Sequence, residues 1–378
     1  MARKDSYDEL DDQPATTKKF RRRRASFFGF LSVLAGIAAL KVVYRDQISA
    51  WLAHRYDAAG DRLLFRHVPR AMHRDGPFLI DELIGDRPQA IVTRAEGVAA
   101  ARAHAGPIHF IFHSAFCAST LLVRALDMPG HAMGLSEPVL LNDITGLRRR
   151  GERNGAELAR LLDDALLLLA RRWSPAETLV VKPSNILAGL MVPMMALRPD
   201  TKALLLHAPL PEFLVSVARK GLWCRLWARE LLEGLIRENL VDLGFETRDY
   251  FRLSDLQVAA VGWLAQQRLF VALANQFPDR VRTLDSERLL ADPAPAIEAL
   301  GALSIIPPAA VAESGAAHSD VFARHSKSGA DFSMAAREAE RAAAKEAHGD
   351  EIDKVHAWAV AIAGTAGIPL TLPQPLLG

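Results

Sequence analysis

From residue 107 onward, short apolar runs recur along the chain and alternate with longer, more mixed segments. The runs contain few polar residues, which is typical of strands that are buried on both faces of a parallel sheet. The sequence therefore predicts strands at residues 107–113, 132–137, 178–184, 202–208 and 279–285.

The segments between these runs have helical periodicity. Residues 155–173 carry leucines at i, i+3 and i+4 spacing, and residues 253–276 form a longer helical pattern with Ser254 as a candidate N-cap. Shorter helical patterns cover residues 212–222 and 293–303. Alternation of strands and helices predicts an α/β fold with a three-layer, doubly wound parallel sheet, whose ligand lies at the carboxyl ends of the strands.

The amino-terminal part has a different pattern. Residues 1–24 split into an acidic run and a basic run, which indicates a disordered charged tail. Residues 25–44 are almost uncharged and approach the roughly 20 residues that span a bilayer. They predict a single-pass membrane anchor, with the arginines before it on the cytoplasmic side. A cleaved signal peptide and a buried helix of a cytoplasmic protein are the alternatives.

The predicted α/β domain covers residues 105–365, and residues 45–104 and 366–378 flank it. Residues 45–104 mix Arg, His and Pro with short apolar runs, and we expect a linker followed by helices. Near the other end, the Ala-rich residues 334–364 predict a pair of helices broken near Gly349. Residues 366–378 are expected to form a tail.

The composition excludes some functional classes. Half of the 378 residues are hydrophobic, so the chain can bury a large core and is not globally disordered. A net charge of +2 does not favour nucleic-acid binding. The two cysteines, Cys117 and Cys224, lack the spacing of a zinc site, and no metal is expected.

One loop has the features of an anion site. Residues 114–118 join a predicted strand to a predicted helix, and the free N–H groups of such a junction attract phosphate. Ser114, Ser119 and Thr120 are candidate ligand-binding residues there. The alternative is an ordinary turn with a Ser/Thr cap, because the loop has neither Gly nor Lys.

The stretch "CASTLL" in this loop resembles the 5′-phosphosulfate loop of the sulfotransferases, and the order of the other segments is similar to that family. Phe116 stands where the family has a Lys or Arg, and Ala118 stands where it has a Gly. "SEPVLLND" resembles the next family segment and makes Glu137 the candidate general base. "VVKPSN" resembles the strand that ends in Lys-Thr-His. Lys182 matches the Lys, whereas Ser184 takes the place of the His.

The resemblance also implies residues that bind a 3′-phosphate. In "LLLHAPLPEFLVSVARKG", Ser216 matches the family's Ser, and His207 occupies the position of its Arg. The loop that follows His207 is one residue longer than in the family. "RHSKSG" resembles the loop that closes over the nucleotide, with Arg324 and Lys327 as its basic residues.

Taken together, the resemblance implies a divergent, PAPS-dependent sulfotransferase with a P-loop-type fold. Such an enzyme moves a sulfuryl group from PAPS, its nucleotide co-substrate, to a hydroxyl-bearing acceptor. Two alternatives stay open. One is a catalytically silent relative that acts as a binding or scaffold protein. The other is a P-loop kinase or NTPase, although the chain has no GxxxxGK[ST] motif.

Overall fold

The structure is a computed structural model that describes residues 50–313, 321–322 and 334–378. The predicted charged tail at residues 1–24 and the predicted membrane anchor at residues 25–44 lie outside the described residues, as do Arg324 and Lys327. Within the described ranges, no helix has both the length and the apolar character needed to cross a membrane.

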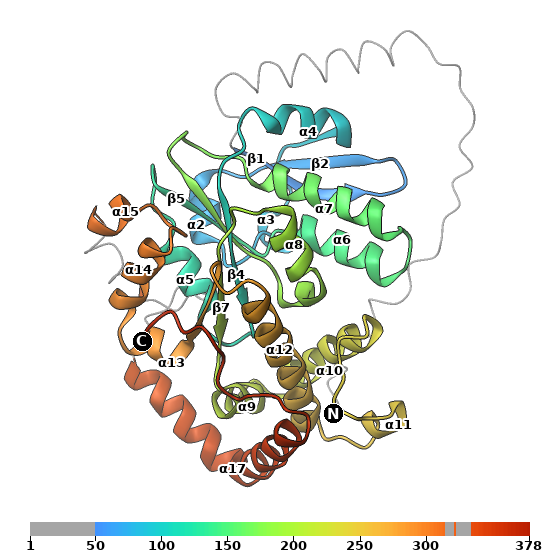
Figure 1. The fold of residues 1–378 in the computed structure, drawn as a ribbon, viewed down its shortest axis with the longest axis vertical. Coiled ribbons are helices and arrows are strands. Elements are labelled where there is room, and N and C mark those ends of the chain that lie inside the picture. Colours follow the sequence, from blue (N-terminus) through green and yellow to red (C-terminus); the bar gives the residue numbers. More distant parts are fainter. Residues whose placement is uncertain (1–49, 314–320, 323–333) are drawn as a thin grey trace, which may run out of the picture. The chain divides into compact units, whose positions relative to one another are not determined.

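A parallel sheet forms the centre of the described chain (Figure 1). Its strand order is β5-β6-β4-β7-β8, and every neighbouring pair is parallel. The chain leaves β4 toward one edge and later crosses to the other, so the order reverses beside β4. Such a switch point opens a crevice at the carboxyl ends of the strands. The strands are β4 (Ile108–His113), β5 (Ala132–Ser136), β6 (Thr178–Lys182), β7 (Ala203–His207) and β8 (Val281–Asp285).

Helices connect these strands, and the prediction of a mixed α/β fold with a parallel sheet is confirmed. Two long helices, α7 (Gly155–Leu169) and α12 (Asp255–Gln276), match the periodic segments, and Ser254 caps the start of α12 by accepting a hydrogen bond from the Gln257 N–H. The connecting elements are α5 (Ser119–Ala125), α6 (Val139–Arg149), α7 (Gly155–Leu169), η2 (Asn185–Leu190), α8 (Met191–Leu197), α9 (Leu210–Arg219), α10 (Gly221–Arg237), α11 (Thr247–Tyr250) and α12 (Asp255–Gln276). Three short helices follow the last strand, α13 (Ser286–Ala291), α14 (Pro293–Ala302) and α15 (Pro308–Glu313).

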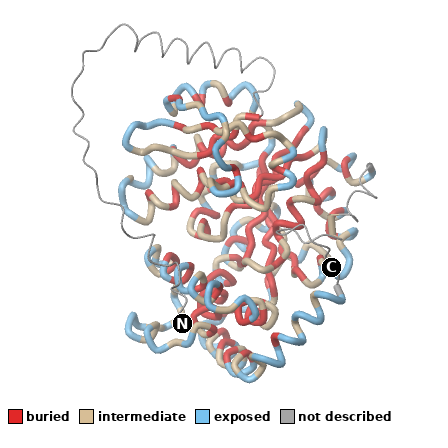
Figure 2. Tube along the Cα trace, turned by 180° about the vertical axis from the view of Figure 1, so that it is seen from behind, coloured by how far each residue is buried: buried red, intermediate tan, exposed pale blue. Residues whose placement is uncertain are grey.

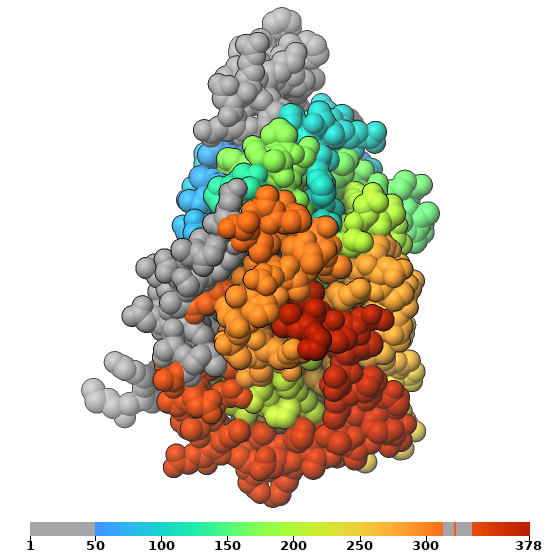
Figure 3. Space-filling view, turned by 60° about the vertical axis from the view of Figure 1, so that its left-hand side comes forward, coloured from blue at the N-terminus to red at the C-terminus, as the bar shows by residue number. Residues whose placement is uncertain are grey.

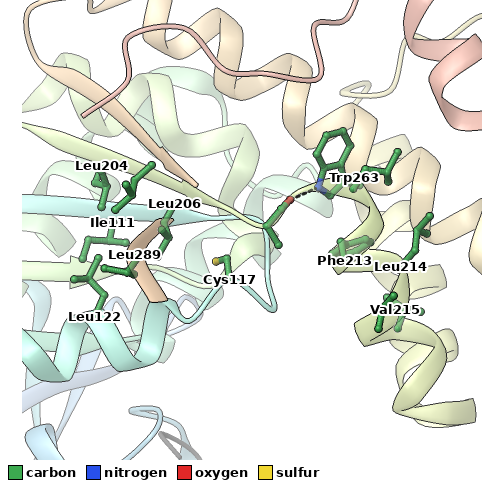
Figure 4. Close-up of a cluster of buried hydrophobic side chains, with 14 of the residues drawn as sticks. Ile111, Cys117, Leu122, Leu204, Leu206, Phe213, Leu214, Val215, Trp263 and Leu289 are labelled. Atoms are coloured by element: carbon green, nitrogen blue, oxygen red, sulfur yellow. Dashed lines mark hydrogen bonds between the residues drawn. The ribbon is translucent and has the colours of Figure 1, made fainter. Parts of the chain in front are cut away.

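Both faces of the sheet are buried (Figure 2). On one face, Ile111 and Leu206 lie in a cluster with Leu122 of α5 (Figure 4). Alternate side chains of a strand point to opposite faces, so Phe112 lies on the other side, near Phe270 of α12. This double coverage is the reason that the strand sequences are continuous apolar runs.

Trp263 of α12 anchors the segment that follows β7. Its indole Nε1 donates a hydrogen bond to the Ala208 carbonyl at 2.9 Å, and the side chain is 1% exposed (Figure 4). The bond satisfies a buried carbonyl just beyond the strand end and fixes the direction in which the chain enters α9.

The expectation of a linker and helices at residues 45–104 is wrong for part of this range. Three strands form a separate antiparallel sheet, β1 (Trp51–Asp57), β2 (Arg62–His67) and β3 (Gln89–Thr93), beside α2 (Arg70–Asp75), α3 (Asp81–Ile84) and α4 (Arg94–Arg102). Arg and His residues interrupt the apolar pattern of these strands. Arg55, for example, forms a bidentate ion pair with Asp143 of α6, at 2.8 and 2.9 Å.

The Ala-rich segment forms one helix, α17 (Met334–Thr365), so the predicted break near Gly349 is wrong. A glycine inside a helix costs only about 1 kcal/mol relative to alanine. Burial of Ile352, Val355 and Ala359 in the main apolar cluster offsets that cost.

Residues 366–378, expected to be a tail, are packed against the domain (Figure 3). The Thr283 N–H donates to the Gln374 carbonyl at 2.9 Å, and the Leu376 N–H donates to the Thr283 carbonyl at 2.8 Å. Leu372 is buried. The segment therefore extends the hydrogen bonding of β8.

We predict that the protein loses stability as the pH falls from about 6.5 to about 4. Burial lowers the pKa of both His73 and His109 to about 4. The unfolded chain, whose histidines titrate near 6.5, binds protons in this window that the folded chain does not, so protonation favours unfolding. His109→Asn keeps an acceptor for the Lys202 N–H, which is bonded to His109 Nδ1 at 3.0 Å, but cannot titrate.

The measurement is the urea midpoint of the wild type and of His109→Asn across this pH range. Removing one titrating group should lower the slope of the free energy of unfolding against pH by up to about 1.4 kcal/mol per pH unit. His104→Asn, at an exposed position, is the matched control. Equal slopes for the wild type and His109→Asn would contradict the assignment.

Candidate functional site

The loop after β4 has an unusual backbone. Ala115, Phe116 and Ala118 have positive φ values of 68°, 52° and 60°. Residues other than glycine rarely adopt this conformation, which costs on the order of 1 kcal/mol or more at each position. Left-handed residues in close succession gather backbone N–H groups into a concave nest that suits an anion. The loop thus has, without any glycine, a strained backbone geometry of the kind that suits an anion.

His113, the last residue of β4, holds this loop in place. Its Nδ1 accepts a hydrogen bond from the Ala115 N–H at 3.2 Å, and its Nε2 donates to the Pro183 carbonyl at 3.1 Å. These two bonds require the neutral tautomer with the proton on Nε2. The Ser114 Oγ accepts a bond from the Ala208 N–H at 3.0 Å. Ser114 therefore ties the loop to the end of β7.

Lys182 and Glu137, the predicted catalytic pair, lie next to each other. Lys182 ends β6 with 0% of its side chain exposed, and its Nζ forms an ion pair with Glu137 Oε1. The ammonium also lies 5.0 Å from the centroid of the Phe78 ring. Glu137 has a φ of 51°, and its N–H donates to the Lys182 carbonyl at 2.7 Å. His113 Nε2 is 3.8 Å from the same Glu137 oxygen.

A cavity of about 460 Å³ opens at these strand ends, and five of the nine predicted site residues line it. The five come from helices α5 and α9, the end of β6 and the loop after β5. They are Ser119, Thr120, Glu137, Lys182 and Ser216.

Asn185 also lines the cavity, and the sequence did not predict it. The Asn185 Nδ2 is buried and finds no hydrogen-bond partner among the described residues. Such an amide is available to a ligand oxygen. No sequence signal distinguishes Asn185 from an ordinary residue of a turn.

Phe116, which replaces the family's basic residue, packs against aromatic side chains. Its ring centroid lies 5.8 Å from that of Phe213 and 5.4 Å from that of Trp227. The Lys220 Nζ lies 5.7 Å from the same ring. A cation therefore reaches the loop from the junction of α9 and α10.

His207 does not join Ser216 in this cavity. It lines a second cavity of about 300 Å³ together with Asp285 and His356. Burial lowers the pKa of His207, and the nearby Asp285 carboxylate partly opposes this shift. The structure therefore separates two residues that were expected to bind the same phosphate.

The described part of the chain contains no group of three or more His, Cys, Asp or Glu side chains that could hold a metal ion. Burial raises the pKa of the Cys117 thiol, which disfavours the nucleophilic thiolate.

The chain matches no protein-family model and no curated protein at a significant level. Among solved structures it is similar to the "Sulfotransferase Domain from the Curacin Biosynthetic Pathway", with 17% identity. The similarity covers 53% of this chain and 73% of that one, with a TM-score of 0.34. At this TM-score the similarity assigns no activity, so the functional interpretation depends on the geometry of the cavity.

We predict that Glu137→Gln destabilises the protein by about 3 kcal/mol, because it leaves the buried Lys182 ammonium without its counter-charge. Lys182→Met should cost less, and the double substitution Glu137→Gln with Lys182→Met should recover most of the loss. The measurement is chemical denaturation of all four proteins as a double-mutant cycle.

Glu233→Gln with Arg237→Met is the matched control, because both members of that ion pair are mostly exposed. Its coupling energy should stay below about 0.5 kcal/mol. Additive effects at Glu137 and Lys182 would contradict the buried ion pair.

Proposed function

We propose that the protein transfers a sulfuryl group from PAPS to a hydroxyl-bearing acceptor in the 460 Å³ cavity. One observation carries the proposal. The cavity brings together an anion cradle, the hydroxyls of Ser119 and Thr120, and a buried Lys–Glu pair. Binding of a nucleotide phosphosulfate needs the anion cradle and the two hydroxyls. Transfer of its sulfuryl group needs a cation and a base, which Lys182 and Glu137 supply.

The loop residues 114–118 bind the 5′-phosphosulfate. Backbone N–H groups of the cradle and the hydroxyls of Ser119 and Thr120 donate to its oxygens. Lys220, beside Phe116, adds positive charge at the same loop. Ser216 of α9 faces the same cavity and contacts the phosphate at the other end of the nucleotide.

The transfer step uses Glu137 and Lys182. The acceptor oxygen forms a bond to sulfur as the bond between sulfur and the bridging phosphate oxygen breaks. The acceptor proton passes to the Glu137 carboxylate, and PAP leaves with the electron pair of the broken bond. The Lys182 ammonium stabilises the negative charge that develops on the oxygens around the sulfur.

A second candidate is a nucleotide-binding protein without transferase activity. The observation that favours it is the Phe116 ring, which occupies the place of a basic residue and packs against Phe213 and Trp227. Binding through backbone N–H groups survives such a change, whereas stabilisation of the leaving oxygen loses one cation.

We predict that Thr120→Val weakens PAP binding about tenfold, because one hydrogen bond to a charged group contributes about 1–2 kcal/mol. The measurement is isothermal titration of the full chain with PAP, and with ATP as the competing nucleotide. Thr201→Val is the matched control, since Thr201 is also buried but bonds to the Ile108 carbonyl, outside the cavity.

Thr201→Val should bind PAP like the wild type, and the wild type should prefer PAP to ATP. Unchanged PAP affinity in Thr120→Val would mean that the loop is only a structural turn. Equal affinity for both nucleotides would favour a kinase or NTPase.

We also predict that Lys182→Met abolishes sulfuryl transfer while leaving PAP affinity within about threefold. A single cation or donor aimed at developing charge contributes about 100-fold or more to a rate. The measurement is transfer of radiolabelled sulfate from PAPS, together with the PAP titration above.

The double substitution Glu137→Gln with Lys182→Met separates chemistry from folding, because it should be stable but inactive. Transfer by Lys182→Met at the wild-type rate would contradict the assigned role. A wild type that binds PAP but transfers nothing to any alcohol would support the silent alternative.

A further inference from the structure

Several exposed large apolar side chains of the described residues lie close together in sequence. Leu222 is 68% exposed and Trp223 is 67% exposed. Leu226, one helical turn beyond Leu222, is 50% exposed. Leu222, Trp223 and Leu226 occupy neighbouring positions on the first turns of α10, and we refer to them as the α10 apolar face. Exposed apolar residues gathered in this way indicate a binding surface.

The α10 apolar face is continuous with the cavity. Trp223 belongs to both, because its side chain is largely exposed and also lines the cavity. The cavity wall itself contains Phe78, Ile80 and Ile186 as well as the polar groups. An apolar path therefore leads from the Lys182–Glu137 pair to the surface of α10.

Two arginines of α10 are paired with carboxylates of this chain. Arg225 lies 3.2 Å from Glu351, and Arg229 lies 2.6 Å from Asp255. These arginines are already neutralised, so they add little attraction to an acidic lipid surface or an acidic protein. The face therefore suits an apolar occupant rather than an anionic one.

We propose that the acceptor is an amphiphilic alcohol whose hydroxyl reaches Glu137 and whose alkyl chain leaves past Trp223 to lie on Leu222 and Leu226. This inference rests on the proposed transferase function and names its substrate class. A sugar or a charged peptide would gain nothing from the α10 apolar face, whereas each methylene that it covers removes apolar area from water.

The first test measures binding without nucleotide. The full chain is titrated with hexyl, octyl and decyl sulfate, which have the chemistry of the sulfated product, below their micelle concentrations. Burial of a methylene predicts a two- to fourfold fall in Kd for each one added. Leu222→Ser with Leu226→Ser should remove this dependence, and both positions are exposed, so the fold should be unaffected.

Ile91→Ser is the matched control, because Ile91 is 55% exposed but belongs to the separate antiparallel sheet. It should keep the dependence on chain length. The second test measures transfer from PAPS to butanol, hexanol, octanol and decanol. KM should fall with chain length in the wild type and Ile91→Ser but not in the double variant, while kcat stays similar.

Equal affinity for all chain lengths would overturn the inference. So would a wild-type dimer that the double variant converts to a monomer, because a second copy would then cover the face. Vesicle binding that the double variant loses would equally overturn it in favour of a bilayer. Failure of PAP to bind contradicts the proposed function alone, since the alkyl sulfate titration contains no nucleotide.

Discussion

The buried ion pair between Lys182 and Glu137 is the constraint on which the carboxyl edge of the sheet depends. An ammonium with 0% exposure at the end of β6 requires a carboxylate beside it. The chain supplies one by turning Glu137 into the left-handed region and bonding its N–H to the Lys182 carbonyl. Phe78 and His113 pack around the pair. Burying the Lys182 ammonium beside a carboxylate that is only 19% exposed costs several kcal/mol, so the arrangement contributes to a site at the expense of stability.

A second unfavourable feature at the same edge of the sheet is the backbone strain of the loop after β4. Three residues other than glycine have positive φ there. His113 connects the two features, because it bonds to the Ala115 N–H of the loop and to the Pro183 carbonyl beyond β6. Strain and buried charge thus occur within one hydrogen-bonded unit. Such clustering is typical of functional sites, and here it coincides with the cavity at the switch point of the sheet.

The sequence predicts the parallel sheet well because burial on both faces gives apolar runs that need no long-range information. It fails for the antiparallel sheet, where residues such as Arg55 find their ion-pair partner on a distant helix. It also fails at Gly349, because packing along α17 outweighs the low intrinsic helix propensity of glycine. In the site, a motif locates Lys182, whereas the role of His113 depends on contacts across 70 residues. His207, the last residue of β7, lines a different cavity, which no local pattern reveals.

Under the proposed function, the charge balance of the pair would link proton transfer to the presence of the sulfuryl group. At rest, the Lys182 ammonium and the Glu137 carboxylate neutralise each other. If Glu137 takes the acceptor proton, a buried positive charge remains, and an unpaired buried charge is expensive. The negative charge that develops between sulfur and the leaving phosphate oxygen compensates it at that moment. In the proposed reaction, this compensation would make proton transfer to Glu137 depend on the bound donor nucleotide, so transfer would follow only after both substrates have entered.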